Sequence, residues 1–207
     1  LCYVVLVFFL SILFKKFYPK NKELLRKIIH IGMGPLIPIS KLLEIEQHTA
    51  LYFTGFITLL IIINYVYKFV PLIEDIDRRS FGTLFYCLSL FILITIFWEK
   101  DPSALIVGYF IMAFGDGLAG LIGKNIKSKN WKVFNQKKSI LGTLTMFVVS
   151  ILVVSIVNYT KDINLYYSYL LIACVSTLLE QISVIGIDNF TVPIVSSFLF
   201  NYLITNN

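Results

Sequence analysis

Long apolar runs separated by short polar segments follow one another along the whole chain of 207 residues. A helix needs roughly 17–25 apolar residues to cross the hydrocarbon core of a bilayer. The candidate spans are residues 1–14, 28–43, 49–67, 80–98, 103–123, 139–159, 165–186 and 189–205. This pattern predicts an all-α fold, a polytopic bundle of about seven or eight transmembrane helices. We expect residues 1–207 to form a single integral membrane domain.

Two of these runs depart from an uninterrupted span. The first has 14 residues, which is short for a bilayer, so we interpret it as a helix truncated at its N-terminus. It lacks the basic start and the small-residue cleavage site of a signal peptide. The run at 28–43 contains Pro35 and Pro38. Because proline removes a backbone donor, this run predicts a broken or tilted helix.

Basic residues are concentrated in alternate connections between the runs. Fifteen of the 18 Lys and Arg residues lie in three segments, 15–27, 68–79 and 124–138. The alternate connections contribute one each: Lys41, Lys100 and Lys161. Cytoplasmic loops carry the excess of positive charge in membrane proteins. We therefore expect the three basic segments to face the cytoplasm and both termini to lie on the opposite side.

The composition agrees with a protein of the lipid bilayer. Apolar residues make up 57% of the chain and charged residues 14%, whereas a soluble domain has about 25% charged residues. Such a composition excludes disordered, collagen-like and disulfide-rich chains. The three cysteines form no CxxC pair, which disfavours a zinc site. We attribute the net charge of +6 to membrane orientation and expect no nucleic-acid partner.

One carboxylate lies deep inside a predicted span. Asp116 stands between Gly115 and Gly117 in the fifth run, about 12 Å of helix rise from the expected cytoplasmic end. Charges within a bilayer are costly and mark functional sites. Close helix packing explains the neighbouring glycines, but it does not explain the acid, so Asp116 is a candidate functional residue.

Further acids and an amide follow near the end of the seventh run. Glu180 is a second acid within a span, and its alternative role is a structural carboxyl bonded to Ser176 or Ser183 on its own helix. Asp188 and Asn189 stand at the turn before the last run. Their alternative role is to cap that helix. All three are expected at the cytoplasmic ends of their spans.

Basic and hydroxyl side chains gather at the same ends of the predicted helices. They are Arg26 and His30 in the second run, Arg79 and Ser80 at the fourth, Lys124 after the fifth, and Lys138, Ser139 and Gly142 at the sixth. Free N–H groups and the helix dipole make such helix starts suitable for phosphate. Acids for Mg²⁺ and bases for phosphate, within an apolar bundle, indicate an enzyme that uses a nucleotide and acts on a lipid.

Four motifs carry a resemblance to a known family. They are RKIIH at 26–30, GDGLAGLIGK at 115–124, KSILGT at 138–143 and DNFTVP at 188–193, and RSFGTLFY at 79–86 also fits. In this order the motifs resemble the dolichol kinase and phytol kinase family, CTP-dependent polyprenol kinases related to membrane cytidylyltransferases. The resemblance covers residues 26–195, and the small size of the chain is more similar to the phytol kinases.

The resemblance implies an activity and roles for the residues. A lipid-alcohol kinase of this family transfers the terminal phosphoryl group of CTP to phytol or a related prenol at the cytoplasmic membrane face. Asp116 and Asp188 would bind Mg²⁺; a separate base is optional for phosphoryl transfer, and His30 or Glu180 is the candidate for it. The expected nucleotide contacts are Arg26, Arg79, Ser80, Gly115, Gly117, Lys124, Lys138, Ser139, Gly142 and Asn189.

The chain departs from the family pattern at Leu141, where an acid is common. Either that acid is dispensable, or metal binding here depends more on Asp116, Glu180 and Asp188. Two other functions stay open: a cytidylyltransferase that makes a CDP-lipid with the same site, and an ion-coupled transporter that uses Asp116 and Glu180. The clustering of the acids toward one face and the lack of an inverted repeat in the sequence disfavour the transporter.

Overall fold

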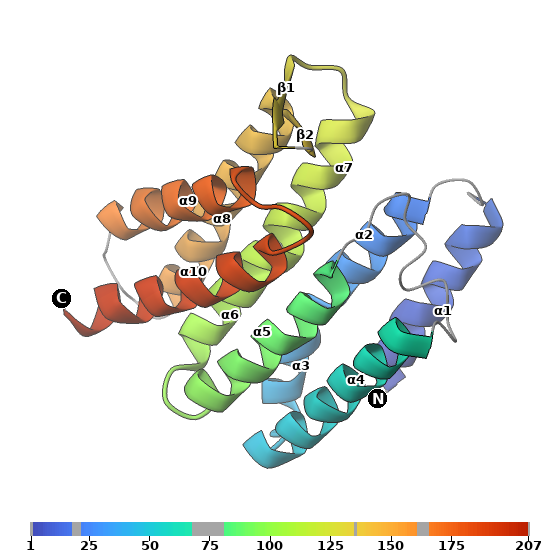
Figure 1. Cartoon of the computed structure of the whole chain (residues 1–207). Helices are drawn as coiled ribbons and strands as arrows, with labels where there is room; N and C mark the ends of the chain where they lie inside the picture. Colours follow the sequence, from blue (N-terminus) through green and yellow to red (C-terminus); the bar gives the residue numbers. More distant parts are fainter. Residues whose placement is uncertain (1, 18–21, 68–80, 135, 161–165, 207) are drawn as a thin grey trace.

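The computed structural model describes residues 2–17, 22–67, 81–134, 136–160 and 166–206, which are mostly helical (Figure 1). The α-helices are α1 (Cys2–Phe17), α2 (Lys22–Gly32), α3 (Leu36–Leu42), α4 (Gln47–Tyr67), α5 (Gly82–Phe97), α6 (Pro102–Phe110), α7 (Gly117–Asn125), α8 (Ile140–Thr160), α9 (Tyr166–Gln181) and α10 (Asp188–Thr205). The π-helix η2 (Ile111–Asp116) joins α6 to α7. The predicted all-α class is confirmed, and each of the eight apolar runs contains a helix.

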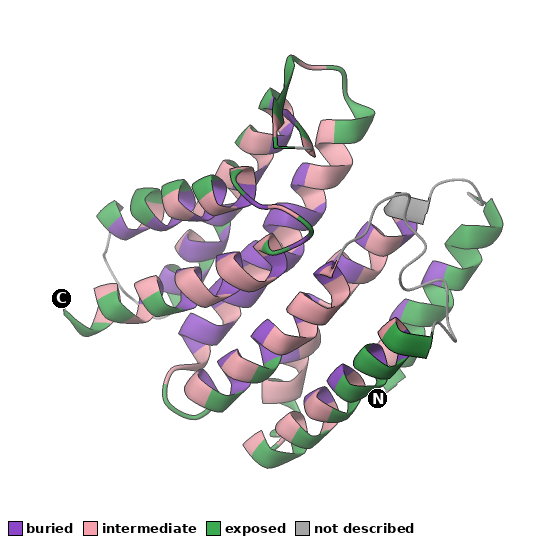
Figure 2. Cartoon of the chain, in the orientation of Figure 1, coloured by how far each residue is buried: buried purple, intermediate pink, exposed green. Residues whose placement is uncertain are grey.

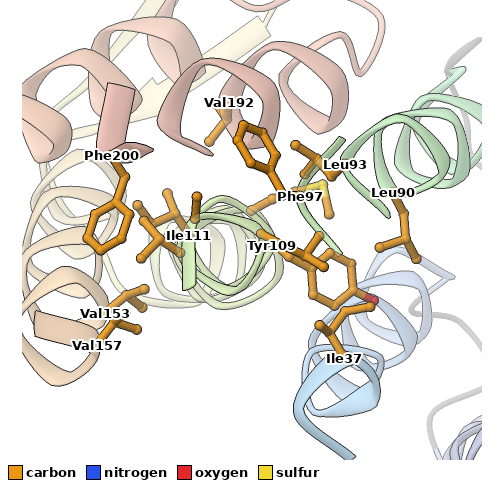
Figure 3. Close-up of a cluster of buried hydrophobic side chains, with 14 of the residues drawn as sticks. Ile37, Leu90, Leu93, Phe97, Tyr109, Ile111, Val153, Val157, Val192 and Phe200 are labelled. Atoms are coloured by element: carbon orange, nitrogen blue, oxygen red, sulfur yellow. The ribbon is translucent and has the colours of Figure 1, made fainter. Parts of the chain in front are cut away.

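The continuous helix α6–η2–α7 forms the centre of the bundle. It begins at Asp101, whose Oδ1 accepts hydrogen bonds of 3.2 Å from the N–H groups of both Ser103 and Ala104, a typical N-cap. Side chains of α5, α8 and α10 surround it, and Tyr109 and Ile111 are completely buried among them (Figure 3). The π-helix η2 that follows ends at Asp116, and π-helical segments are frequent at functional sites.

The helix break predicted at Pro35 is confirmed. Helix α2 ends at Gly32, a turn follows, and α3 begins at Leu36, directly after Pro35. Pro38 lies in the first turn of α3, where its missing N–H has no helical partner to lose. Tyr109 fixes this bend, because its hydroxyl donates a 3.0 Å hydrogen bond to the carbonyl of Met33.

Three helices of the described residues are long and apolar enough to cross a membrane: α4, the continuous helix from Pro102 to Asn125, and α8. Large apolar side chains such as Phe56, Leu59 and Leu152 are more than half exposed on α4 and α8. Figure 2 shows exposed positions along the outer side of α4. Contiguous exposed apolar surface is typical of a membrane-facing protein. The count of seven or eight spanning helices stays a prediction.

A small β-hairpin interrupts the helical pattern and was not predicted. Strand β1 (Asn130–Val133) pairs antiparallel with β2 (Gln136–Ser139), and Asn130 lies opposite Ser139. The predicted connection at 124–138 is therefore partly ordered. Because β2 leads directly into α8, the hairpin holds Lys138 and Ser139 at the start of that helix.

Candidate active site

Three carboxylates from separate elements meet at one end of the bundle. Asp116 ends η2, Glu180 lies in the last turn of α9, and Asp188 begins α10. One oxygen of each lies within 4.8 Å of the others. Asp116 and Glu180 are only 7% exposed. Three carboxylates of like charge this close together repel one another unless cations compensate them.

Two buried lysines supply part of that compensation. Lys27 Nζ lies 2.6 Å from Asp116 Oδ2 and also donates to the Asp116 carbonyl at 3.1 Å. Lys138 Nζ lies 2.5 Å from Glu180 Oε1 and donates to the Glu180 carbonyl at 2.6 Å. Both lysines are less than 10% exposed. A buried charge requires a partner of this kind, so each lysine stabilises one acid of the cluster.

His30 joins the cluster from α2. Its Nε2 lies 3.0 Å from the Met112 carbonyl and 3.5 Å from Asp116 Oδ2. Since both neighbours are oxygen acceptors, Nε2 must carry the hydrogen, and Nδ1 is then the acceptor of a neutral ring. The ring of Tyr86 packs edge-on against His30, with 4.8 Å between centroids.

The structure excludes the structural alternative for Glu180, and its functional role stays a prediction. A structural bond to Ser176 or Ser183 is wrong, because Ser176 donates to the Ile172 carbonyl and Ser183 donates to Asp188 Oδ2 at 2.9 Å. The Glu180 carboxylate is held instead by Lys138 and, at its other oxygen, by Gln181 Nε2 at 2.7 Å.

The residues at the start of α10 connect this helix to its neighbours. The N-cap position is Ile187, which has no capping side chain, while Asp188 Oδ1 accepts from the N–H of Asn189 at 3.0 Å. Asn189 Nδ2 donates to the Gly82 carbonyl at 3.0 Å, and its own carbonyl accepts from Ser89 Oγ at 2.8 Å. Asn189 therefore fixes the start of α10 against α5.

These charged groups line a polar pocket of about 350 Å³, a volume typical of small-ligand sites. Most of the predicted site residues lie on its wall: Arg26, Asp116, Lys124, Lys138, Ser139, Gly142, Glu180, Asp188 and Asn189. The pocket wall comes from five helices, η2 and the hairpin, so the fold gathers motifs that are widely separated in the sequence.

Two of the predicted nucleotide contacts, Gly115 and Gly117, do not line this pocket. Gly115 packs against Met146, and Gly117 packs against Ile31; an added Cβ would lie 2.7 and 2.4 Å from these side chains. Both glycines thus serve helix packing, and their contact with the nucleotide stays a prediction, while Gly120 and Gly123 line the pocket. Arg79 and Ser80, like Lys161, lie outside the described residues.

Sequence reasoning missed several polar residues of the pocket, among them Lys27 and Gln181. Lys27 was counted only as a charge that orients the chain, although it stands beside Arg26 within the first motif. Gln181 Nε2 bridges Glu180 to Thr143 Oγ1, the latter at 2.8 Å. The position of Gln181 directly after Glu180 was the one available signal, and Thr143 lay within the third motif.

Ser139 has a clear structural role in addition to its place on the pocket wall. Its Oγ accepts a 3.1 Å hydrogen bond from the N–H of Gly142, three residues further on, as an N-cap does. Gly142 and Gly123 lie back to back here, because an added Cβ on Gly123 would be 3.3 Å from the Cα of Gly142. This close approach brings α7 and α8 together under the pocket.

A second, apolar cavity of about 480 Å³ adjoins the polar pocket. Side chains of α1, α2, α4 and α5 form most of its wall, among them Phe8, Ile29, Ile57 and Leu90. His30 also lines this cavity. Arg26 and Asn189 line both the polar pocket and the apolar cavity, so the two spaces share a boundary.

The donor set of the carboxylate cluster fits a hard divalent cation. Mg²⁺ is bound through one or two carboxylates together with water and phosphate oxygens, and the cluster offers three carboxylates. Among the described residues, Lys27 and His30 both contact Oδ2 of Asp116, so Oδ1 is the oxygen suited to a cation. Asp188 has no lysine within ion-pair distance among those residues, which also suits this role.

The fold and the pocket indicate a class: a helical protein with an apolar surface, whose site suits phosphate and a divalent cation beside an apolar ligand. Over 181 residues the chain is 36% identical to a phytol kinase of Synechocystis sp., covering 86% of this chain and 78% of that protein. It is 26% identical over 210 residues to a wheat (Triticum aestivum) protein named "Probable phytol kinase, chloroplastic", which covers 90% of this chain and 69% of that protein. It is 25% identical over 207 residues to the chloroplastic phytol kinase 1 of Arabidopsis thaliana, covering 88% and 67%.

The chain therefore belongs to the phytol kinase family. The family resemblance drawn from the four motifs is confirmed. No family model matches the chain, and no solved structure is significantly similar to it.

Proposed function

We propose that this protein is a lipid-alcohol kinase that transfers the terminal phosphoryl group of a nucleotide, with CTP as the expected donor, to phytol or a related prenol. One observation carries the proposal: the polar pocket and the apolar cavity meet at Arg26 and Asn189. A phosphoryl donor on one side and an apolar acceptor on the other would thus meet at this boundary. Membership of the phytol kinase family supports the same reaction.

The charge of the polar pocket suits a triphosphate. Six basic residues line it: Arg26, Lys27, Lys124, Lys127, Lys137 and Lys138. Three carboxylates also line it, so the basic side chains on the described part of the wall outnumber the acidic ones, which suits an anionic ligand. Phosphoryl transfer depends mainly on positioning and on stabilisation of phosphate charge. The side chains of this pocket wall would provide both.

Asp116 and Asp188, with Glu180 beside them, would hold Mg²⁺ in this proposal. When bound, the ion supplies positive charge that neutralises phosphate oxygens. Lys138 would keep Glu180 in position through the contact at 2.5 Å. Lys27 would offset the remaining charge of Asp116.

His30 is the candidate base for the acceptor hydroxyl. It lines the apolar cavity and contacts Asp116, so it stands between the two ligands. With the hydrogen on Nε2, the proton of an alcohol would pass to Nδ1. Asp116 and the Met112 carbonyl would orient the ring and stabilise the imidazolium.

The acceptor is better matched by a neutral alcohol than by a lipid phosphate. A cytidylyltransferase would need basic side chains for the phosphate of its lipid substrate. Arg26 and His30 are the basic residues that line the apolar cavity within the described chain, and Arg26 also faces the polar pocket. This distribution of charge favours the kinase over the cytidylyltransferase.

We further propose that the protein is a multi-pass membrane protein with the site at the cytoplasmic face. The central helix from Pro102 to Asn125 has 24 residues, or about 36 Å of rise, enough to cross a bilayer. The pocket lies at its Asn125 end, next to the segment 124–138 with six basic residues. The positive-inside rule assigns this end to the cytoplasm.

The test follows the fate of each phosphate. Purified protein in detergent is given Mg²⁺, CTP labelled at the α or the γ phosphate, and as acceptor either phytol or phytyl monophosphate. The kinase reaction puts γ label into the lipid and releases CDP. Transfer of α label with release of pyrophosphate would overturn the proposal in favour of the cytidylyltransferase. ATP, GTP and UTP tested in parallel establish the donor.

A further inference from the structure

One end of the apolar cavity, here called the polar end, adjoins the polar pocket at Arg26 and Asn189. The other end, here called the far end, lies deeper in the bundle. The α4 and α5 helices run antiparallel along the cavity: Tyr65 stacks on Phe81 at 4.8 Å between centroids, and Gly55 lies beside Phe91 at the opposite end. Gly82 lies at the polar end, because its carbonyl accepts a hydrogen bond from Asn189. Leu90 lies at the far end, about 12 Å deeper along α5. Both residues line the cavity.

The far end is lined by buried side chains. Leu90 is 5% exposed and Thr54 is 7% exposed, and both line the cavity. The hydroxyl of Thr54 donates to the Ala50 carbonyl at 2.8 Å, so the side chain presents its methyl group to other neighbours. This end of the cavity is thus buried and apolar.

The side wall is open toward the exterior. Phe8 of α1 and Leu60 and Ile63 of α4 line the cavity, yet they are 38%, 44% and 36% exposed. Because these three apolar side chains line the cavity and also reach the outer surface of the protein, the cavity is connected to the exterior beside them. An alcohol dissolved in the bilayer could reach the cavity without passing through water.

We propose that this cavity binds the prenyl chain of the acceptor alcohol, and that Thr54 and Leu90 at its far end contact the chain and select among acceptors by chain length. This inference rests on the proposed kinase function for the hydroxyl end of the same ligand. The hydroxyl lies at the boundary formed by Arg26 and Asn189, beside His30. The chain runs from there between α2, α4 and α5 toward Leu90.

Chain-length selectivity tests the far end. Thr54→Phe and Leu90→Phe fill it, and prenols of 10, 15 and 20 carbons are compared as acceptors. We expect kcat/KM for the 20-carbon alcohol to fall about tenfold or more, that for the 10-carbon alcohol to change little, and the KM for CTP to stay constant. Leu59→Phe, on the same helix but 53% exposed and outside the cavity, is the matched control. Equal losses for all chain lengths would overturn the assignment.

A binding measurement keeps the inference separate from the proposed activity. A 20-carbon prenol with a diazirine at its chain terminus is photolysed on the purified protein, and the labelled peptides are identified by mass spectrometry. Label on α4 near Thr54 and on α5 near Leu90 supports the inference even if no phosphoryl transfer occurs. Phosphoryl transfer with label elsewhere overturns the inference and leaves the kinase standing.

Discussion

Lys27 and Asp116 are 89 residues apart in sequence, yet their side chains form a buried ion pair of 2.6 Å that joins α2 to the end of η2. Gly120 makes the contact possible, because an added Cβ there would lie 2.6 Å from Lys27 Cε. The small residues that follow Asp116 therefore serve the site by giving this lysine room. Because the two charges are paired inside the protein, removing one of them leaves the other buried without this partner.

Replacing Lys27 by Met should destabilise the fold. The substitution leaves the Asp116 charge buried with a weaker partner, His30, and breaking a buried pair costs about 3–5 kcal/mol. Thermal unfolding of the purified protein in detergent measures the effect. Lys127→Met, at an exposed lysine on the same pocket, should change the free energy of unfolding by less than about 0.5 kcal/mol.

A double substitution shows whether the pair is the cause. Lys27→Met combined with Asp116→Asn removes both charges, so it should be more stable than Lys27→Met alone. A double variant no more stable than the single one would mean that the lost stability comes from packing of the lysine stem.

Asp116→Asn should reduce phosphoryl transfer at least tenfold, which corresponds to a barrier increase of about 1.4 kcal/mol. An amide keeps the shape but cannot neutralise a hard cation. Because this substitution removes the carboxylate that pairs with Lys27, activity is also measured in the charge-balanced Asp116→Asn/Lys27→Met protein. Glu99→Gln, at an exposed acid, is the control. Retention of more than about a tenth of wild-type activity would exclude Asp116 as an essential metal ligand.

Two substitutions separate the capping role of Ser139 from its place in the pocket. Ser139→Ala removes the acceptor of the Gly142 N–H and should cost about 1 kcal/mol of stability. Ser139→Asp keeps the cap, since Asp is a good N-cap residue, but it adds negative charge where phosphate is expected. We expect the capping hydrogen bond to be kept and activity to fall at least tenfold, measured by label transfer. Full activity of Ser139→Asp would restrict Ser139 to capping.

The helices could be predicted from the sequence because apolar runs of sufficient length have few alternatives to a helix. The break at Pro35 followed from the missing backbone donor. The acids were found for a similar reason, since a carboxylate such as Asp116 in an apolar run is costly unless it has a function. Each of these signals lies within a short stretch of residues, so a single sequence is enough to detect it.

The pairings within the site could not be predicted because they depend on how distant helices pack. Nothing near Lys27 marks Asp116 as its partner, and nothing near Lys138 marks Glu180. Lysines next to helix ends are also what orientation in the membrane requires. The hairpin strand at 136–139 is short and polar, so it carries no alternating apolar pattern to reveal it.

Gly108 lies in a tight contact between α6 and α10. An added Cβ would lie 2.1 Å from Ser197 Oγ and 2.3 Å from the Pro193 carbonyl on α10. Backbone cannot yield as a flexible side chain can, so Gly108→Ala should destabilise the protein by about 1–3 kcal/mol. Gly55→Ala meets its nearest atom, Phe91 Cε2, at 3.3 Å and should have a smaller effect on thermal unfolding. Equal effects of the two would contradict this assignment of a tight helix contact.

The proposed orientation can be tested at the two ends of the central helix. Lys100 and Asn130 are both exposed and flank the helix from Pro102 to Asn125, whose rise of about 36 Å exceeds the hydrocarbon thickness. Single cysteines are introduced at each position after the native Cys2, Cys87 and Cys174 have been replaced by serine. A membrane-impermeant maleimide added to sealed, right-side-out cells should label Lys100→Cys, whereas Asn130→Cys should react only after the cells are opened. Because the pocket adjoins the Asn130 end, labelling of Asn130→Cys from outside would move the site to the opposite face, where no cytosolic nucleotide could reach it.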